Sequence, residues 1–489
     1  MLFNSPLFVV FFGFVFVLYW ALRRRTSQNV LLLVASYVFY GAWSRKFLAL
    51  LIVSTVADYL CGLLISSLSE RRHKRLMLIL SVALNLTLLG VFKYSGFFVT
   101  QAVELLDWLG FQANVHTLEV ALPVGISFYT FQSLSYVIDV YRGKLPATRN
   151  LMEYALYVAF FPQLVAGPIE RATHLLPQIK RERAWSGVAL ESGLQLMVWG
   201  LFKKVVIADN LAPYVNAVYR EPAAFSGTVL VTATVFFAFQ IYCDFSGYSD
   251  TARGVARTLG FELMRNFDDP YFSRNPVEFW RRWHISLSQW FQDYLYFPLA
   301  LRAMRKGGWG SKYRAHIVSM GLIGLWHGAN WTFVTFGLYW GFVIALYLYV
   351  TERLAERAPP TAERAPASSG RVAQVVAPAL MFAVVCVGWV FFRAASLGDA
   401  WAILTRIFSP TGESSVLRPD VAAPPMLWAL VAGLWLVEWV ARNRPRVAEI
   451  VSASAVPRLI VRHALIVAIL FSFLVAHKGT SRPFIYFQF

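Results

Sequence analysis

The sequence predicts an all-α integral membrane protein that crosses the bilayer many times. Of its 489 residues, 57% are apolar and 16% are aromatic, while only 15% are charged. A typical soluble domain carries about 25% charged residues. The mean hydropathy is +0.53, and apolar runs recur along almost the whole chain with no polar stretch the size of a soluble domain between them. These values exclude a chain of ordinary soluble domains.

The net charge of +18 comes from 45 Lys and Arg residues against 27 Asp and Glu residues. In a soluble protein this excess would indicate nucleic-acid binding, but here the charges lie in short loops that flank apolar runs. We therefore expect membrane lipid around the chain and no nucleic-acid partner. The three cysteines lie far apart in or at the ends of apolar runs, so they are interpreted as core residues and not as a metal site.

The first apolar run, Leu7 to Leu22, has no basic residues before it and three arginines, Arg23 to Arg25, after it. A secretory signal has the opposite polarity, so this run is predicted to be a retained span with its N-terminus outside. Together with the further runs, of which the short run 315–328 either crosses or is re-entrant, it gives about 11 predicted transmembrane helices. The further runs lie near 30–43, 47–68, 76–99, 120–141, 190–208, 226–243, 315–328, 331–350, 376–392, 427–441 and 459–477.

One apolar segment, Leu151 to Gly167, does not fit a simple crossing. It lies between two basic loops, Arg142 to Arg149 and Arg171 to Arg183, and it contains Pro162. Proline interrupts a helix, and irregular backbone is tolerated at membrane depth where protein covers it. A re-entrant segment with both ends on the cytoplasmic side is therefore predicted.

A polar and aromatic stretch, residues 244–314, follows the span near 226–243. Within it, Asn275 and Pro276 predict a helix start, with Asn275 as N-cap. The residues that follow predict one amphipathic helix, Phe279 to Tyr296, lying at the membrane interface. His284 falls at the edge of its apolar stripe. The stripe consists of Trp280, Trp283, Leu287, Trp290 and Tyr294.

A second histidine, His327, ends the short apolar segment 315–328. Fourteen helical residues cover about 21 Å, less than the roughly 30 Å of a hydrocarbon core, so His327 is predicted to lie at membrane depth. The segment is either re-entrant or crosses, and crossing with His327 in the outer half is favoured. Histidine suits proton abstraction from a hydroxyl, although a purely structural histidine is the alternative. His284 and His327 lack the spacing of metal ligands.

Five stretches resemble, in order, the membrane-bound O-acyltransferase family, and most closely its bacterial alginate O-acetylation branch. Together with the N-terminal spans the resemblance covers most of the chain. It implies a single domain, 1–489, built as a helical bundle with re-entrant and interfacial helices around a central tunnel. The resembling stretches are Pro123 to Gln132, Phe161 to Ile169, Asp244 to Asp250, Glu278 to Ser288 and Trp326 to Trp331.

On this resemblance the chain is divided into N-terminal spans (1–119), a catalytic core (120–350), a solvated linker (351–375) and C-terminal spans with an aromatic tail (376–489). The family's catalytic histidine corresponds to His327, and its second essential polar residue corresponds to His284. Further residues of the resembling stretches are expected to line or support the tunnel. These are Trp326, Asn330, Trp283, Asp244 and Gln132, with helix capping or hydrogen bonding as the alternative for Asp244.

The implied activity is acetyl transfer across the bacterial inner membrane. Cytoplasmic acetyl-CoA would be the donor substrate, with no bound cofactor and no metal. An exopolysaccharide, alginate-like or cellulose, would be the acceptor, reached through a periplasmic acetyltransferase or acetyl-carrier protein. Arg281 and Arg282, in the basic stretch after residue 265, are candidates for the donor's phosphates, and plain positive-inside orientation is the alternative.

The last six residues, Phe484 to Phe489, resemble the terminal motif of a small membrane peptide of bacterial D-alanylation. That resemblance implies that Tyr486 relays the acyl group, against the alternative of an aromatic anchor at the interface. Three other functions stay open on the sequence. They are a D-alanyl transferase of the same superfamily, a lipid O-acyltransferase and a non-enzymatic polysaccharide or acyl transporter.

Overall fold

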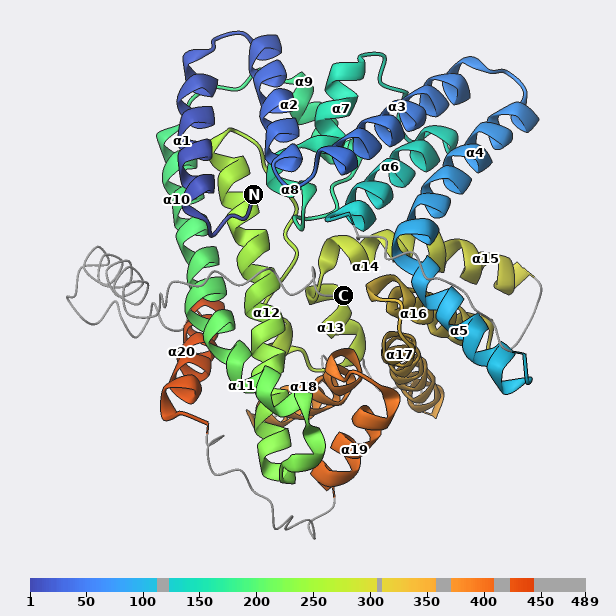
Figure 1. Ribbon diagram of the computed structural model, residues 1–489, viewed down its shortest axis with the longest axis vertical. Helices are drawn as coiled ribbons and strands as arrows, with labels where there is room; N and C mark the ends of the chain where they lie inside the picture. Colours follow the sequence, from blue (N-terminus) through green and yellow to red (C-terminus); the bar gives the residue numbers. More distant parts are fainter. Residues whose placement is uncertain (112–122, 306–309, 358–370, 409–422, 444–489) are drawn as a thin grey trace, which may run out of the picture.

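The computed structural model describes residues 1–111, 123–305, 310–357, 371–408 and 423–443, and every regular element in these ranges is a helix (Figure 1). Within them, six helical segments are long and apolar enough to cross a membrane. The six segments are α3 (Arg45–Ser67), the continuous rod Arg71–Trp108, α12 (Gly227–Thr258), α17 (Trp331–Arg357), Gln374–Arg393 and α20 (Pro425–Arg442).

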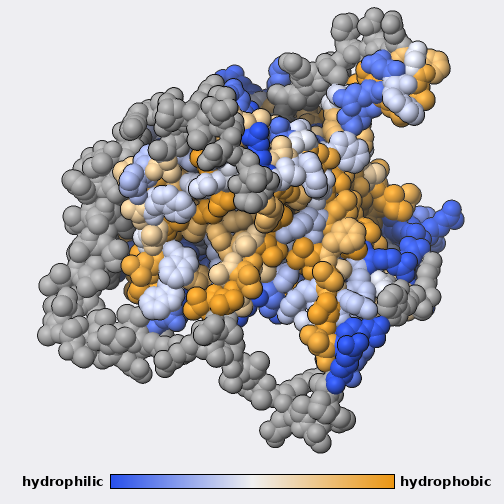
Figure 2. All heavy atoms as spheres, turned by 90° about the horizontal axis from the view of Figure 1, so that it is seen from below, coloured by the Kyte–Doolittle hydropathy of each residue, from blue (hydrophilic) through white to orange (hydrophobic). Residues whose placement is uncertain are grey.

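The predicted all-helical, multi-pass membrane architecture is confirmed. The count of about 11 spans stays a prediction, and the predicted span 459–477 and Tyr486 lie outside the described residues. Seen from below in Figure 2, apolar side chains cover much of the described surface, and hydrophilic ones gather mainly toward its edges. This is the distribution expected of a surface in contact with lipid.

The N-terminal helices are α1 (Pro6–Ala21) and α2 (Arg25–Gly41), followed by α3 and α4 (Arg71–Leu89). Ser5 caps α1 because its side chain accepts a hydrogen bond from Phe8 N, with proline at the first helical position. The rod after α3 continues past α4 through a π-helical turn, η1 (Gly90–Tyr94), into α5 (Ser95–Trp108). The predicted end of this span at residue 99 is therefore too early.

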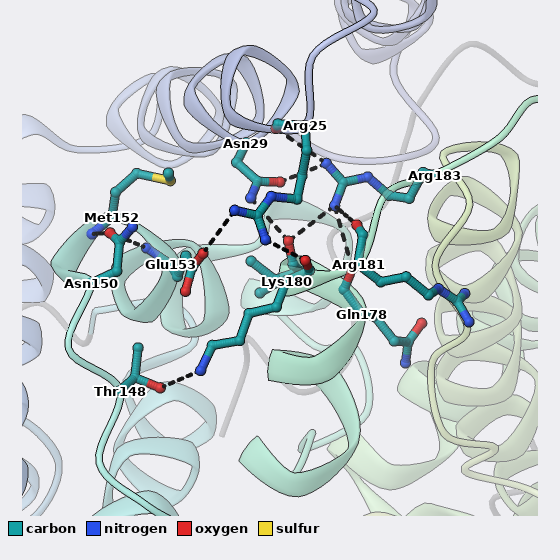
Figure 3. A network of polar contacts seen from close by, with 11 residues as sticks. Arg25, Asn29, Thr148, Asn150, Met152, Glu153, Gln178, Lys180, Arg181 and Arg183 are labelled. Atoms are coloured by element: carbon teal, nitrogen blue, oxygen red, sulfur yellow. Dashed lines mark hydrogen bonds and ion pairs between the residues drawn. The ribbon is translucent and has the colours of Figure 1, made fainter.

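The segment predicted to be re-entrant folds back toward its beginning, and its placement in the membrane stays a prediction. After α6 (Ile126–Tyr141), the chain forms the short helices α7 (Leu151–Ala159), α8 (Phe161–Leu164) and α9 (Ala172–Lys180). Lys180 Nζ donates a 3.3 Å hydrogen bond to Thr148 Oγ1 (Figure 3), so the end of the segment returns to its beginning.

Polar contacts also join the basic loop after α1, and the start of α2, to the segment from α7 to Arg183 (Figure 3). Arg183 Nη2 donates to Asn29 Oδ1 at 2.7 Å, and Asn29 Nδ2 donates to Ile179 O at 3.0 Å. Arg25 Nη2 lies 3.7 Å from Glu153 Oε1. Three basic loops that charge distribution assigns to the cytoplasmic side thus meet in one network.

Two long helices, α10 (Gly187–Leu201) and α12, run side by side (Figure 1). Glycines allow this close approach, because a Cβ added at Gly193 would lie 2.8 Å from Gly254 O. Between the two helices the chain forms the π-helical turn η2 (Phe202–Ala208), α11 (Asp209–Arg220) and the short 3₁₀ helix η3 (Pro222–Ala224). The polar motif after Cys243 continues α12 as far as Thr258, beyond the predicted span end at 243.

The predicted single interfacial helix Phe279 to Tyr296 is wrong. The chain breaks at Trp283 and His284, and the aromatic stripe is buried in the protein instead of lying on lipid. The predicted N-cap is correct, since Glu278 N donates to Asn275 Oδ1 at 2.8 Å. The elements of this region are η4 (Pro270–Phe272), α13 (Pro276–Arg282), α14 (Ile285–Phe291), the π-helical turn η5 (Gln292–Tyr296) and α15 (Phe297–Arg305).

The C-terminal described helices are α16 (Ser311–His327), α17, α18 (Arg371–Arg393), α19 (Leu397–Phe408) and α20. Helix α16 runs antiparallel along α17, with Lys312 Nζ bound to Glu352 Oε2 at 2.7 Å at one end and His327 at the other. Whether the segment 315–328 crosses the membrane or is re-entrant stays a prediction. The predicted linker 351–375 is shorter than expected, since α17 continues to Arg357 and α18 begins at Arg371.

Candidate active site

His284 is held at the break between α13 and α14 in a strained backbone conformation. Its φ is 43° and its ψ is 56°, a left-handed geometry that is uncommon for a residue other than glycine. The next two residues are fixed to Asn266: Ile285 N donates to Asn266 O at 2.8 Å, and Ser286 Oγ donates to Asn266 Oδ1 at 2.6 Å. These bonds hold the turn that carries the imidazole inward.

The imidazole of His284 is fully buried. Its ring meets the edge of Phe245, on α12, with a centroid separation of 4.5 Å, and the ring of Trp326 lies 6.1 Å away. The sequence pattern does not indicate how the break in the predicted interfacial helix changes the position of His284. It moves this histidine from the rim of an amphipathic helix into the centre of the molecule.

His327 is the last residue of α16 and is 4% exposed. Trp326 packs near both histidines, with its ring 4.8 Å from His327 and 6.1 Å from His284. The ring of Phe392, on α18, lies 5.0 Å from His327. Two histidines that are far apart in the sequence are thus brought together around one tryptophan, within a wall of aromatic rings.

The predicted support residues divide into two groups. Trp326 and Trp283 belong to the aromatic wall: Phe131 stacks on Trp326 at 5.6 Å, and Trp389 lies 4.9 Å from Trp283. The structure brings these rings to the histidines, where they exclude water and define the shape of the site.

The other three predicted support residues lie in contacts between helices. Gln132 Nε2 donates to Tyr157 O at 2.6 Å, joining α6 to α7. Asp244 Oδ1 pairs with Lys204 Nζ at 2.5 Å. Asn330 Nδ2 donates to Ala395 O at 3.2 Å, while its Oδ1 accepts from Thr332 N at 3.0 Å as a cap of α17. In the described contacts these residues act on the framework, and only indirectly on the histidines.

The two arginines predicted to bind donor phosphates point to different surroundings. Arg282 Nη2 lies 2.9 Å from Glu278 Oε1, and its Nη1 donates to Asp268 O at 3.2 Å. Arg281 is exposed and lines a groove of about 570 Å³ between α13 and α17, together with Tyr347 and Thr351. The groove is open to solvent, and Glu278 also lines it.

A lysine that sequence reasoning passed over contacts the site. Lys93 Nζ donates to Trp326 O at 2.6 Å and to His327 O at 3.1 Å. The next residue, Tyr94, donates its hydroxyl to Leu325 O at 3.0 Å. The signal was present in the sequence, because a lysine inside the apolar run 76–99 is rare enough to indicate a role.

A titratable pair, Glu170 and His174, lies next to the contacts that support the His284 turn. Ile169 N donates to Ser286 Oγ at 2.9 Å, and the next residue, Glu170, accepts from Met264 N and contacts His174 Nδ1 at 2.6 Å. Burial raises the pKa of the Glu170 carboxyl. The hydrogen bond to Glu170 raises the pKa of the His174 imidazole.

Within the part of the chain that the structure describes, no group of three His, Cys, Asp or Glu side chains is arranged to hold a metal ion. The chemical resources at the centre are two imidazoles, the carbonyls at the end of α16 and a dry aromatic wall. This combination suits proton transfer with charge stabilisation in a site that excludes water.

Comparison with known proteins shows the family of the chain. Residues 37–387 match the model of the membrane-bound O-acyltransferase family, so the chain belongs to that family and is an O-acyltransferase. It is 40% identical over 410 residues to a probable alginate O-acetylase AlgI of Pseudomonas aeruginosa, covering 84% of this chain and 75% of the relative.

Two further relatives extend the comparison. A probable alginate O-acetylase AlgI of Pseudomonas putida is 36% identical over 507 residues, covering the whole of both chains. A peptidoglycan O-acetyltransferase of Helicobacter pylori is 34% identical over 456 residues, covering 85% of this chain and 81% of that one. The predicted family, its enzymatic character and the membrane setting are thereby confirmed.

Proposed function

We propose that this protein moves an acetyl group from cytoplasmic acetyl-CoA across the bacterial inner membrane for O-acetylation of an exopolysaccharide. The observation that carries this function is the meeting of His327 and His284 around Trp326 at the end of α16. A buried pair of imidazoles within aromatic walls suits acyl transfer, which needs a base for one hydroxyl and protection from hydrolysis.

In this proposal His327 is the general base. It takes the proton from an acceptor hydroxyl as that oxygen attacks the carbonyl carbon of the acetyl thioester. The C–S bond then breaks, the thiolate of CoA leaves and accepts a proton, and the acetyl ester remains on the acceptor oxygen. His284 orients the acceptor or stabilises the negative charge that develops on the carbonyl oxygen.

The donor's phosphates are proposed to bind at the groove lined by Arg281. Its guanidinium is exposed there, whereas Arg282 is held by Glu278 and Asp268. Positive charge with free donor groups suits a phosphate. Of the two arginines, Arg281 is therefore the one we expect to affect the Michaelis constant for acetyl-CoA.

The acceptor class follows from the relatives. Those described as alginate O-acetylases and as a peptidoglycan O-acetyltransferase are named for acetylation of polysaccharides. By analogy the final acceptor of this chain is a bacterial polysaccharide, with alginate-like polymer or cellulose as our choice. Periplasmic acetyltransferase or acetyl-carrier proteins would receive the acetyl group, and Tyr486 stays a candidate relay.

The test compares acyl donors and a variant. Membrane vesicles that carry the full chain are supplied with labelled acetyl-CoA, palmitoyl-CoA or a D-alanyl carrier protein. In cells, His327→Ala is compared with His73→Ala, which replaces a histidine on an exposed part of α4.

We expect acetyl-CoA to be the accepted donor and His327→Ala cells to export polymer without acetyl groups, while His73→Ala cells acetylate normally. Use of palmitoyl or D-alanyl donors would assign another acyl group. Acetylated polymer that His327→Ala cells fail to export would support a transporter and overturn the proposal.

A further inference from the structure

Lys93 lies within the apolar rod Arg71–Trp108, at the π-helical turn η1. A lysine at such a depth is costly unless polar groups meet it. Its Nζ donates to two carbonyl oxygens, Trp326 O at 2.6 Å and His327 O at 3.1 Å. Across the described ranges it forms no ion pair with a carboxylate. Its described hydrogen bonds thus go to the end of α16.

The C-terminal end of an α-helix requires hydrogen-bond donors from outside the helix. The last four carbonyls of an α-helix have no partner within the helix. The helix α16 stops at His327, because Gly328 is extended with φ −168° and ψ 156°. Lys93 serves the carbonyls of the last two residues, and Tyr94 serves that of Leu325 at 3.0 Å. Three of the four terminal carbonyls are therefore capped by two consecutive residues.

The π-helical turn explains how consecutive residues reach one target. In a regular α-helix neighbouring side chains point to different faces, and only residues three or four apart share one. The wider turn at η1 lets Lys93 and Tyr94 both bond to α16. Turns of this kind are frequent at functional sites. The Lys93 ammonium also lies 5.5 Å from the centre of the Trp326 ring, so it touches the residue that packs near both histidines.

We propose that Lys93 is a positioning residue that fixes the last turn of α16, and through it the direction of the His327 imidazole relative to Trp326 and His284. This inference rests on the proposed role of His327 as base. A cation at a helix C-terminus also offsets the partial negative charge of the terminal carbonyls. Because a displacement of about 1 Å can lower a rate about 100-fold, loss of this cap affects turnover more than substrate binding.

The experiment measures turnover number, Michaelis constant for the donor and melting temperature on the purified full-length protein in lipid nanodiscs. Lys93→Met keeps the length of the side chain and removes its donors, whereas Lys93→Arg keeps donors and charge. Lys46→Met is the matched control, because Lys46 is an exposed lysine at the start of α3. The donor used is the acyl donor that the wild-type protein accepts.

We expect Lys93→Met to lower the turnover number by about 10- to 100-fold, with the Michaelis constant within about twofold of the wild-type value. Lys93→Arg is expected to recover at least part of the loss, and Lys46→Met to match the wild type. A Lys93→Met protein with normal turnover per folded molecule would overturn the proposal. So would a loss explained by a lowered melting temperature, or one that Lys93→Arg fails to relieve.

The experiments distinguish failure of the proposed function from failure of the positioning role of Lys93. If wild-type protein uses a donor other than acetyl-CoA, the acetyl assignment fails while the Lys93 comparison proceeds with that donor. If Lys93→Met is fully active although His327→Ala is inactive, the positioning role fails and the role of His327 stands. Tyr94→Phe adds a graded comparison, because it removes one of the three capping bonds, and its loss of turnover is expected to be smaller than that of Lys93→Met.

Discussion

Two π-helical turns present lysines to the helix bundle, and the lysines meet different partners. At η2, Lys203 Nζ lies 2.7 Å from Asp250 Oδ2, and Lys204 Nζ lies 2.5 Å from Asp244 Oδ1. At η1, Lys93 donates to backbone carbonyls at the end of the helix that carries His327.

The different partners indicate different roles for the lysines of η1 and η2. At η2 each lysine has a carboxylate partner on α12, so the group is neutralised within the framework and joins η2 to that helix. At η1 the donor is directed at the catalytic helix, and carbonyls carry no full charge to neutralise. We infer that η2 is needed for folding and η1 for activity, although the sequence presents both simply as lysines in apolar surroundings.

The largest expected effect is at η2. Lys204→Met removes a cation that lies 2.5 Å from Asp244 and 2.9 Å from Asp209. Breaking a buried pair by removing one partner costs about 3–5 kcal/mol. We expect a strong loss of folded protein, measured by thermal unfolding in detergent, and partial recovery when Asp244→Asn is added. A normal melting temperature in Lys204→Met would contradict a structural role for η2.

The next effect separates strain from chemistry at His284. His284→Ala and His284→Gly both remove the imidazole, and both are expected to lower turnover by about 100- to 1,000-fold. Only glycine accepts the left-handed φ of 43° without cost. We therefore expect His284→Gly to be more stable than His284→Ala by about 1–2 kcal/mol in chemical denaturation. Equal stability of the two variants would show that the backbone strain is not retained.

A matched pair of glycines extends the comparison to helix packing. A Cβ at Gly337 would lie 2.9 Å from Gly324 N between α17 and α16, and one at Gly193 would lie 2.8 Å from Gly254 O between α10 and α12. Overpacking costs about 1–3 kcal/mol, so both alanine variants should be less stable. We expect only Gly337→Ala to lower turnover per folded molecule, because it displaces the helix that ends in His327. Equal turnover in the two variants would show that the packing of α17 on α16 at Gly337 does not determine the position of His327.

The smallest effect is a pH dependence outside the membrane. The pKa of His174 is raised by Glu170, so its contribution to stability is full below its ordinary value of 6.5 and is lost as pH rises through the folded-state pKa. Glu170 acts in the same direction, because burial raises its pKa too. We expect the melting temperature to fall as pH rises above about 6.5. His174→Gln should flatten this slope, and an unchanged slope would exclude His174 as its source.

Much of the fold follows from the sequence because lipid imposes strict rules. Apolar length and basic loops are sufficient to predict an all-helical membrane protein. Boundaries are less well determined. The α12 helix continues through Asp244 and Asp250 because lysines of η2 neutralise their charges. A hydropathy pattern contains no information on such partners.

The sequence singles out His284 and His327 as candidate site residues, but it does not predict the geometry that brings them together. A stripe of aromatic residues at helical spacing predicts one continuous helix, and the break at His284 depends on bonds to Asn266, which lies 18 residues earlier in the sequence. The link from Lys93 to His327 joins residues 234 positions apart. Contacts of this range depend on tertiary packing, so local sequence patterns do not reveal them.

The most direct test of the account is acetyl transfer by His327→Gln, measured per folded molecule with labelled acetyl-CoA and polysaccharide in vesicles that carry the full chain and its partners. Glutamine keeps a polar side chain of similar length and cannot take up the proton. We expect transfer to fall by at least about 100-fold at an unchanged melting temperature. Transfer at the wild-type rate would contradict His327 as the base and, with it, the central claim.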